Sequence, residues 1–309
     1  GKDIALEALA KRNDAVIVAI GAQEDRKIGL PGEDLKGIYP GYHFLEAFNM
    51  KQAGVPGGKT LIIGGGNVAI DAARTLWRIG SDVTVAYRRG RGEMPANATE
   101  LDGAESEGVR FMYMMAPEAF LGDDDGRVRA VRFQKMKPGS LDQSGRPTPV
   151  PTGQTIEVPC DAVILAIGER VGSKDLAKSG IECARNGTVR VDAFTQKTNV
   201  SNIYAVGDAV TGPATASEAM GLAKRAAQAI DKDLTGADRF GRLFWKFDYG
   251  MEVPLNPVKS TKVKVRTIPV KERRGNFMEI AQGYSGQQAH GESLRCLRCD
   301  VRDNARIPW

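Results

Sequence analysis

The stretch from Leu61 to Pro95 constrains the fold of this chain more than any other part of its sequence. It opens with a short apolar run and continues into the pattern G-x-G-x-x-A, which is formed by Gly64, Gly65, Gly66, Asn67, Val68 and Ala69. An amphipathic segment then runs to Gly80, and residues 82–86 largely alternate between polar and apolar side chains. This order predicts a strand, a glycine turn, a helix and a second strand. Such a βαβ unit places a pyrophosphate at a helix N-terminus.

Each small residue of the turn has a separate role in such a unit. Gly64 permits the tight turn, Gly66 lets the backbone approach a phosphate, and Ala69 lets the helix and strand pack closely. The sequence therefore predicts a nucleotide-binding turn at residues 64–69.

Two arginines, Arg88 and Arg89, follow the second strand of this unit. A site that prefers NAD usually carries Asp or Glu at that point, which accepts the ribose 2′-hydroxyl. Guanidinium groups would instead bind a 2′-phosphate. If each charge-assisted contact is worth roughly 1.5–3 kcal/mol, two contacts favour NADP(H) by about a hundredfold or more as an upper bound. We therefore expect NADP(H).

An octapeptide occurs twice in the chain with one difference. Residues 14–21 read DAVIVAIG and residues 161–168 read DAVILAIG, so each apolar run ends at a glycine, Gly21 or Gly168. This repeat predicts two copies of one supersecondary plan, each with a strand that ends at a ligand. A third apolar strand ends at Gly207 and Asp208, ahead of a helix over 220–234. A carboxylate in that position suits a polyhydroxyl chain.

The segments between these motifs predict simpler structure. Residues 30–49 read as a turn-rich and then briefly helical connection, and residues 96–108 read as a helix. Residues 109–116, 128–135 and 155–159 read as the strands of an antiparallel meander. The acidic run 123–125 lacks the ligand spacing of a calcium loop and reads as a hairpin turn. The two histidines, His43 and His290, are too few for a metal cluster or a Ser-His-Asp arrangement, so a structural role is expected for both.

Composition narrows the class of protein further. The 309 residues contain no apolar run of membrane-spanning length and no opening signal peptide, and their four cysteines are too few for a disulfide scaffold. We therefore expect a cytoplasmic protein. Residues 237–309 hold 14 Lys and Arg against 8 Asp and Glu, which accounts for the whole net charge of +5. Because no nucleic-acid motif accompanies this tail, we expect it to face an electron-acceptor protein or a larger subunit.

Taken in order, these motifs resemble the flavoproteins with two dinucleotide-binding domains, and most of all the glutamate synthase small (beta) subunit and its relatives. The resemblance rests on G-x-G-x-x-A, AYRR, MP, DAVILAIG and TNVSNIYAVGDA, and it runs from Gly1 to about Leu234. It implies an α/β fold with two Rossmann-like, three-layer ββα domains. Residues 1–50 and 188–236 would form parts of the FAD-binding domain, residues 51–187 the NADP(H)-binding domain, and residues 237–309 a basic C-terminal extension.

The resemblance also implies roles for single residues. Gly64, Gly66 and Ala69 would bind the NADPH pyrophosphate, Arg88 and Arg89 the 2′-phosphate, and Gly207 with Asp208 the ribityl and pyrophosphate groups of FAD. Members of the family begin with their own βαβ unit for the ADP half of FAD. This chain starts after that point, so its FAD-binding domain is expected to be incomplete.

Cys296 and Cys299 form a C-x-x-C motif near the end of the chain. The segment resembles the one with which this family begins an iron–sulfur site, which would make the pair ligands of a 4Fe-4S cluster. Two thiolates cannot complete a four-cysteine cluster, so the other ligands would come from elsewhere. Cys160 and Cys183 are expected to be inert packing residues.

We therefore predict an NADPH-dependent flavoprotein oxidoreductase that passes hydride between NADP(H) and FAD, and then electrons to an iron–sulfur partner. Hydride transfer between stacked rings needs no acid or base from the protein, so no catalytic residue is predicted. Two alternatives stay open. One is a non-catalytic NADP(H)-binding docking subunit with a degenerate flavin site, and the other is a dithiol/disulfide reductase that uses Cys296 and Cys299.

Overall fold

A computed structural model describes residues 3–52, 56–142, 145–237, 239 and 261–295. The chain divides into two compact units, Gly1–Gly241 and Arg242–Trp309. The smaller unit contains helices α8 (Val270–Arg273) and α9 (Gly286–Ser293). Among the described helices, none is both long and apolar enough to cross a membrane.

A five-stranded parallel sheet forms the centre of the larger unit, in the order β3-β10-β4-β5-β6. Its strands are β3 (Ile38–Pro40), β4 (Lys59–Ile63), β5 (Asp82–Tyr87), β6 (Arg110–Tyr113) and β10 (Ala162–Leu165). The central strands are apolar and almost fully buried, as a parallel sheet covered on both faces requires.

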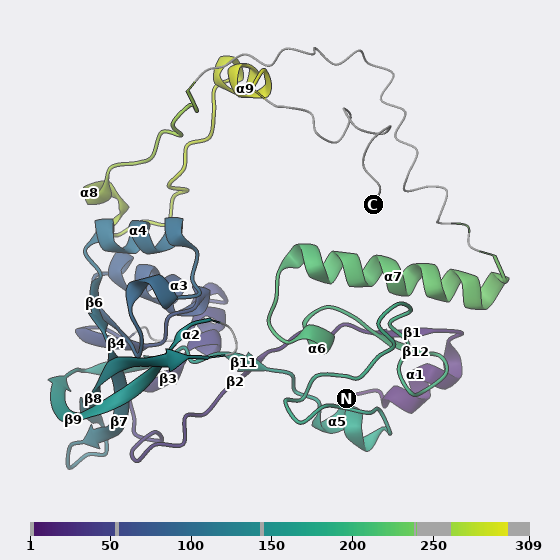
Figure 1. Cartoon of the computed structure of the whole chain (residues 1–309), viewed down its shortest axis with the longest axis horizontal. Helices are drawn as coiled ribbons and strands as arrows, with labels where there is room; N and C mark the ends of the chain where they lie inside the picture. The colour runs from purple at the N-terminus through teal and green to yellow at the C-terminus, as the bar shows by residue number, and fades with distance from the viewer. Residues whose placement is uncertain (1–2, 53–55, 143–144, 238, 240–260, 296–309) are drawn as a thin grey trace. The chain divides into compact units, whose positions relative to one another are not determined.

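Two further layers cover the faces of this sheet (Figure 1). One face carries the helices α2 (Gly41–Asn49), α3 (Asn67–Arg78) and α4 (Ala98–Glu107). The other carries an antiparallel sheet of β7 (Met115–Gly122), β8 (Val128–Leu141) and β9 (Pro147–Pro159). Side chains alternate between the layers, so that Ile62 packs against the helices while Leu61 and Ile63 pack against the antiparallel sheet. The predicted three-layer α/β fold is confirmed.

Two local predictions are corrected. Residues 109–116 were expected to form one strand, but they divide between two sheets at Met114, whose φ of 55° lies in the left-handed region. A methionine there gives no sequence signal, because glycine is the residue that usually marks such a turn. Residues 30–49 were expected to be a turn-rich and then briefly helical connection. The helix is present as α2, which contributes the buried ring of Phe44 to the core. The segment also supplies β3, which was not expected and which extends the parallel sheet beside β10.

A second, smaller sheet consists of β1 (Val16–Val18) and β12 (Ile203–Ala205), which pair in parallel. Its surroundings contain α1 (Leu6–Arg12), α5 (Lys174–Lys178), α6 (Asp208–Thr211) and α7 (Ala216–Thr235). The two copies of the repeated octapeptide therefore supply β1 to this sheet and β10 to the large one.

A short antiparallel ribbon connects the two sheets. It is formed by β2 (Glu24–Asp25), on the way from β1 to β3, and by β11 (Glu169–Arg170), directly after β10. The Asp25 carboxylate accepts hydrogen bonds from the backbone N–H groups of Tyr42 and His43 at 3.0 and 3.2 Å. The ribbon is thereby tied to the first turn of α2.

Candidate functional site

The glycine turn between β4 and α3 is shaped by close packing at its first two positions. Gly64 has a φ of +148°, and a Cβ atom there would lie 2.1 Å from the Ala166 carbonyl oxygen. A Cβ atom on Gly65 would lie 2.6 Å from the ring of Tyr87. The protein's own packing therefore requires glycine at both positions.

Gly66 differs from its two neighbours. Its φ of −89° and ψ of 179° are open to any residue, and a Cβ atom there would meet no heavy atom within 4 Å. Gly66 is the N-cap of α3, and no side chain caps the helix at this point. A helix N-terminus of this kind presents backbone N–H groups that bind anions. The structure thus leaves open space where the sequence pattern predicts a pyrophosphate.

The remaining residues of the pattern contact the rest of the protein and so fix the position of the turn. The Asn67 side-chain oxygen accepts a hydrogen bond of 2.9 Å from the backbone N–H of Asn97. Ala69 is fully buried in the core under the helices, and Val68 packs at the edge of that core. The small size of Ala69 is therefore explained by helix packing.

The two arginines after β5 lie in different environments. Arg88 is exposed, and its side chain forms no hydrogen bond or ion pair with any residue that the structure describes. Arg89 is only 8% exposed. Its guanidinium donates to the Asp142 carboxylate and to the Pro147 carbonyl oxygen, both at 3.0 Å.

Sequence reasoning missed Asp142. It lies 53 positions from Arg89, at the turn between β8 and β9, and no local pattern connects the two residues. The structure therefore divides the predicted pair into Arg88, which is accessible to a ligand, and Arg89, which is bound within the protein.

The second set of predicted residues lies at the smaller sheet. Gly21 and Gly207 follow β1 and β12, which pair with Val18 opposite Ala205, and both glycines have positive φ values of 68° and 64°. Ligands of parallel α/β sheets bind at this carboxyl edge. Asp208 comes next, and its carboxylate forms no hydrogen bond or ion pair among the described residues. It is thus free to accept hydrogen bonds from a hydroxylated ligand.

Gly168 lies between the two sets. It follows β10 with a φ of +105°, and its carbonyl oxygen accepts a 3.1 Å hydrogen bond from the backbone N–H of Arg26. The next residue, Glu169, pairs with Asp25 across the ribbon. Burial raises the pKa of Glu169, the charge of Asp25 raises it further, and that of Asp208 has a smaller effect in the same direction. Asp208, at the smaller sheet, is therefore close enough to act electrostatically on the ribbon.

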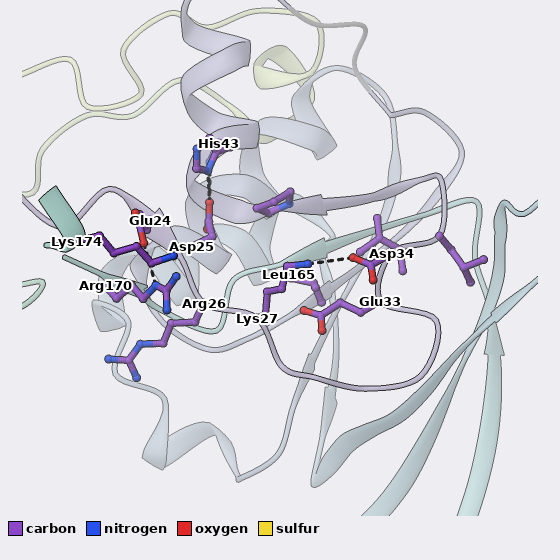
Figure 2. A pocket seen from close by; sticks show the side chains of 13 residues that line it. Glu24, Asp25, Arg26, Lys27, Glu33, Asp34, His43, Leu165, Arg170 and Lys174 are labelled. Carbon is purple, nitrogen blue, oxygen red and sulfur yellow. Dashed lines mark hydrogen bonds and ion pairs between the residues drawn. The ribbon is translucent and has the colours of Figure 1, made fainter. Parts of the chain in front are cut away.

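A pocket of about 510 Å³ opens beside this ribbon, as Figure 2 shows. Leu165, at the end of β10, and Pro40, at the end of β3, are among the residues that line it. The pocket therefore lies at the same carboxyl edge of the large sheet as the glycine turn.

Most charges that line the pocket are paired with one another. Arg170 contacts Glu24 and Lys27 contacts Asp34, both at 3.0 Å (Figure 2). The Nδ1 atom of His43 lies 2.5 Å from an Asp25 carboxylate oxygen. His43 thus takes part in holding the ribbon to α2, in agreement with the structural role expected for it.

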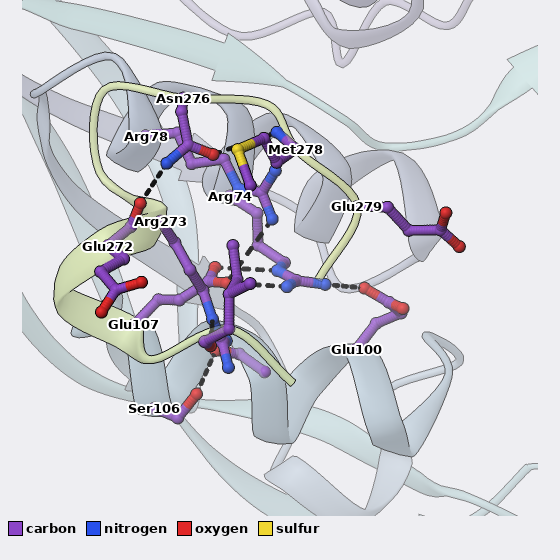
Figure 3. A network of polar contacts seen from close by, with 12 residues as sticks. Arg74, Arg78, Glu100, Ser106, Glu107, Glu272, Arg273, Asn276, Met278 and Glu279 are labelled. Atoms are coloured by element: carbon purple, nitrogen blue, oxygen red, sulfur yellow. Dashed lines mark hydrogen bonds and ion pairs between the residues drawn. The ribbon is translucent and has the colours of Figure 1, made fainter. Parts of the chain in front are cut away.

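Figure 3 shows an ion-pair network that joins the helices α3 and α4. Arg74 on α3 donates two hydrogen bonds, at 2.9 and 2.7 Å, to the Glu107 carboxylate, whose side chain is fully buried. Arg74 also pairs with Glu100. Because α4 begins next to Asn97, the network supports the contact between Asn97 and the glycine turn.

The described cysteines are not arranged for redox or metal chemistry. Burial, with a smaller effect of the Asp161 charge, raises the pKa of the Cys160 thiol to about 12. Cys183 is a half-buried free thiol. Among the residues that the structure describes, no group of three or more His, Cys, Asp or Glu could hold a metal ion. Cys296 and Cys299 lie outside the described residues.

The family model of the pyridine nucleotide-disulphide oxidoreductases matches residues 5–223. The chain belongs to this family. It is 36% identical to the NADP(+)-dependent formate dehydrogenase subunit beta of Moorella thermoacetica, over 97% of this chain and 44% of that protein. It is 35% identical to the glutamate synthase [NADPH] small chain of Azospirillum brasilense, over 69% of this chain and 47% of that protein. The predicted resemblance to the glutamate synthase small subunit is confirmed.

The chain spans about half the length of these curated relatives. Among solved structures, Mycobacterium tuberculosis FprA in complex with NADPH has the same fold. The match has a TM-score of 0.60 at 24% sequence identity and covers 77% of this chain and 67% of FprA.

Proposed function

We propose that this chain is an NADPH-dependent flavoprotein oxidoreductase module that passes hydride between NADP(H) and FAD, and then electrons to an iron–sulfur partner. The conformation of Gly66 is the main support for the proposal. Neither packing nor backbone geometry requires glycine there, so the space in front of its Cα is best explained by a bound phosphate. The names of the relatives, which include an NADP(+)-dependent subunit and an NADPH-linked chain, agree with this cofactor.

In this proposal the NADP(H) pyrophosphate binds at Gly64, Gly65 and Gly66, above the N-terminus of α3. The 2′-phosphate contacts Arg88, which is the exposed member of the arginine pair. One charge-assisted hydrogen bond contributes about 1.5–3 kcal/mol, so the expected preference for NADPH over NADH is about ten- to a hundredfold.

FAD is proposed to bind at the smaller sheet and the ribbon. Gly21, Gly168 and Gly207 would let the backbone approach the cofactor, and the carboxylate of Asp208 would accept hydrogen bonds from ribityl hydroxyls. Bound flavin supplies the conversion between a two-electron hydride and single electrons. The task of the protein is to hold the two ring systems in contact.

The domain division is proposed with two changes to the predicted bounds. Residues 38–168 would bind NADP(H), because β3 is part of the same sheet as β10 and β4. Residues 1–37 and 169–236 would contribute to the FAD-binding part, because Leu176, Ile181 and Cys183 pack in the core of the smaller sheet. In the extension 237–309, Cys296 and Cys299 would supply two ligands of a 4Fe-4S cluster, and the basic surface would contact the partner protein.

Gly66→Ser tests the site itself. Serine is a favourable N-cap residue, so thermal stability should stay the same or rise slightly. Its side chain would occupy the phosphate position, so NADPH affinity measured by calorimetry should fall by about tenfold or more. Gly57→Ser is a matched control, because a Cβ atom on Gly57 also meets nothing within 4 Å but lies outside the turn. Unchanged NADPH affinity in Gly66→Ser would contradict the proposal.

The redox reaction is tested on the full-length protein with FAD bound. Adding NADPH without oxygen should bleach the flavin absorption, and NADH should do so at least about tenfold more slowly at low concentration. Ferricyanide should then restore the absorption. Flavin that stays oxidised in the presence of saturating NADPH would exclude hydride transfer.

A further inference from the structure

We infer that Asp142, at the tip of the β8–β9 hairpin, is a positioning residue for NADP(H) recognition. It holds Arg89 inside the protein, so that Arg88 alone is presented to the 2′-phosphate. The inference rests on the proposed function of the glycine turn and adds a specificity residue from a distant part of the chain.

The contacts of Arg89 connect the end of β5 to both sides of the hairpin turn. Its Nη2 donates to an Asp142 carboxylate oxygen, and its Nε donates to the carbonyl oxygen of Pro147, where β9 begins. Asp142 also organises the turn itself. Its carboxylate accepts a 3.1 Å hydrogen bond from the backbone N–H of Arg146, and its own N–H donates to the Arg146 carbonyl oxygen at 2.8 Å.

The hairpin tip needs such an anchor. The outer part of the hairpin has only two strands, because β7 pairs with β8 no further than Lys135, and Leu141 at the end of β8 is 68% exposed. The Asp142 side chain is 28% exposed and that of Arg89 is 10% exposed. In such a partly buried pair, loss of one partner leaves the other charge without compensation. The position of the tip beside β5 therefore depends on this ion pair.

The ion pair between Arg89 and Asp142 also determines which arginine is available to bind the ligand. The charge of Arg89 is balanced by Asp142, whereas Arg88 is exposed and makes no such contact within the described part of the chain. With Asp142 in place, the backbone next to Arg88 is held on one side by β5 and on the other by Arg89. A backbone fixed in this way loses less conformational freedom when Arg88 binds the 2′-phosphate, which raises affinity.

Asp142→Asn is the informative substitution. Asparagine keeps an oxygen that can accept the Arg146 N–H, but it removes the negative charge that faces Arg89. Binding of adenosine 2′,5′-bisphosphate and of AMP to the chain is measured by calorimetry, because the two ligands differ only in the 2′-phosphate. We expect the ratio of the two affinities to fall by about three- to tenfold, with little change for AMP. Asp142→Glu should restore most of the ratio.

The controls separate this role from a general effect on the hairpin. Glu157→Gln removes the 2.8 Å ion pair between Glu157 and Arg132 in the same hairpin, and it should leave the ratio unchanged. Arg88→Ala should bring the ratio close to one.

The outcomes distinguish the inference from the proposed function. If the unaltered chain does not prefer the bisphosphate, the proposed NADP(H) site is wrong. If it does prefer the bisphosphate but Asp142→Asn has an unchanged or higher ratio, Asp142 does not position Arg88 and the inference is overturned. An equal loss of affinity for both ligands would also overturn the inference. The hairpin would then affect binding of the adenosine part that the two ligands share, and not the contact with the 2′-phosphate.

Discussion

The turn between β4 and α3 and the turn between β12 and α6 are two versions of one local design. In each, a buried parallel strand ends at a glycine with positive φ, and a helix begins within three residues. Their surroundings differ. β4 has a paired strand on both sides and a packed layer on each face of its sheet, whereas β12 pairs with β1 alone in a two-stranded sheet.

Residues of the larger sheet and its helix are more deeply buried than those of the smaller sheet. Ile62 on β4 is fully buried, while Ile17 on β1 is 45% exposed. The helix α3 buries five of its 12 residues, but α7 buries only Ala226 and Asp231 among its 20. A parallel sheet is stable when both faces are covered, and two strands supply little cover for each other. The same motif is thus rigidly preformed at the larger sheet and depends on fewer contacts at the smaller one.

The largest expected effect of a single substitution is at the larger sheet. Arg74→Ala would leave the buried carboxylate of Glu107 without its main partner, and we expect a loss of about 3–5 kcal/mol in the free energy of unfolding, measured with urea. Asp233→Ala is the counterpart at the smaller sheet. It removes 2.6 Å contacts to Tyr204 and Lys197 from a carboxylate that is 45% exposed, so about 1 kcal/mol is expected. Equal losses would contradict the difference in packing.

The two glycines with positive φ sharpen the comparison. In Gly64→Ala, the new methyl group would lie 2.1 Å from the Ala166 carbonyl oxygen, so about 3 kcal/mol or more of stability should be lost. In Gly207→Ala, the methyl group would lie 3.4 Å from the side chain of Ala219. Backbone strain alone then costs about 1–2 kcal/mol. Thermal unfolding of both variants measures the difference, and a greater loss for Gly207→Ala would show that the smaller sheet is the more tightly packed.

The smallest effect is expected at Glu169, on the ribbon between the two sheets. Its pKa is raised above the usual 4.5, mainly by burial. Its ionised form is therefore disfavoured in the folded protein, and its contribution to stability falls as pH rises from about 4.5 through the raised pKa. Glu169→Gln should raise Tm by a few degrees at about pH 7.5 and leave it unchanged at about pH 4. The same increase at both pH values would exclude a charge effect, and Glu157→Gln, on an exposed pair, should change neither.

Much of the larger sheet could be predicted from the sequence because its determinants are local. These determinants are the apolar run before Gly64, the spacing of the small residues and the amphipathic pattern of the helix. All three lie within some twenty consecutive positions. The division at Met114 could not be predicted, since the left-handed conformation of that residue results from the competing demands of two sheets. The edge strand β3 was missed because a three-residue strand carries almost no periodic signal.

The candidate site shows the same division between local and tertiary information. The sequence by itself determined where a glycine turn joins a strand to a helix and that two guanidinium groups follow the next strand, because both features are set by neighbouring residues. Only the tertiary structure decided that Tyr87 packs against Gly65, while the space in front of Gly66 stays open. Only the tertiary structure, likewise, decided that Asp142 holds Arg89 while Arg88 remains exposed. These outcomes depend on which distant side chains meet when the layers pack, and a linear pattern does not carry that information.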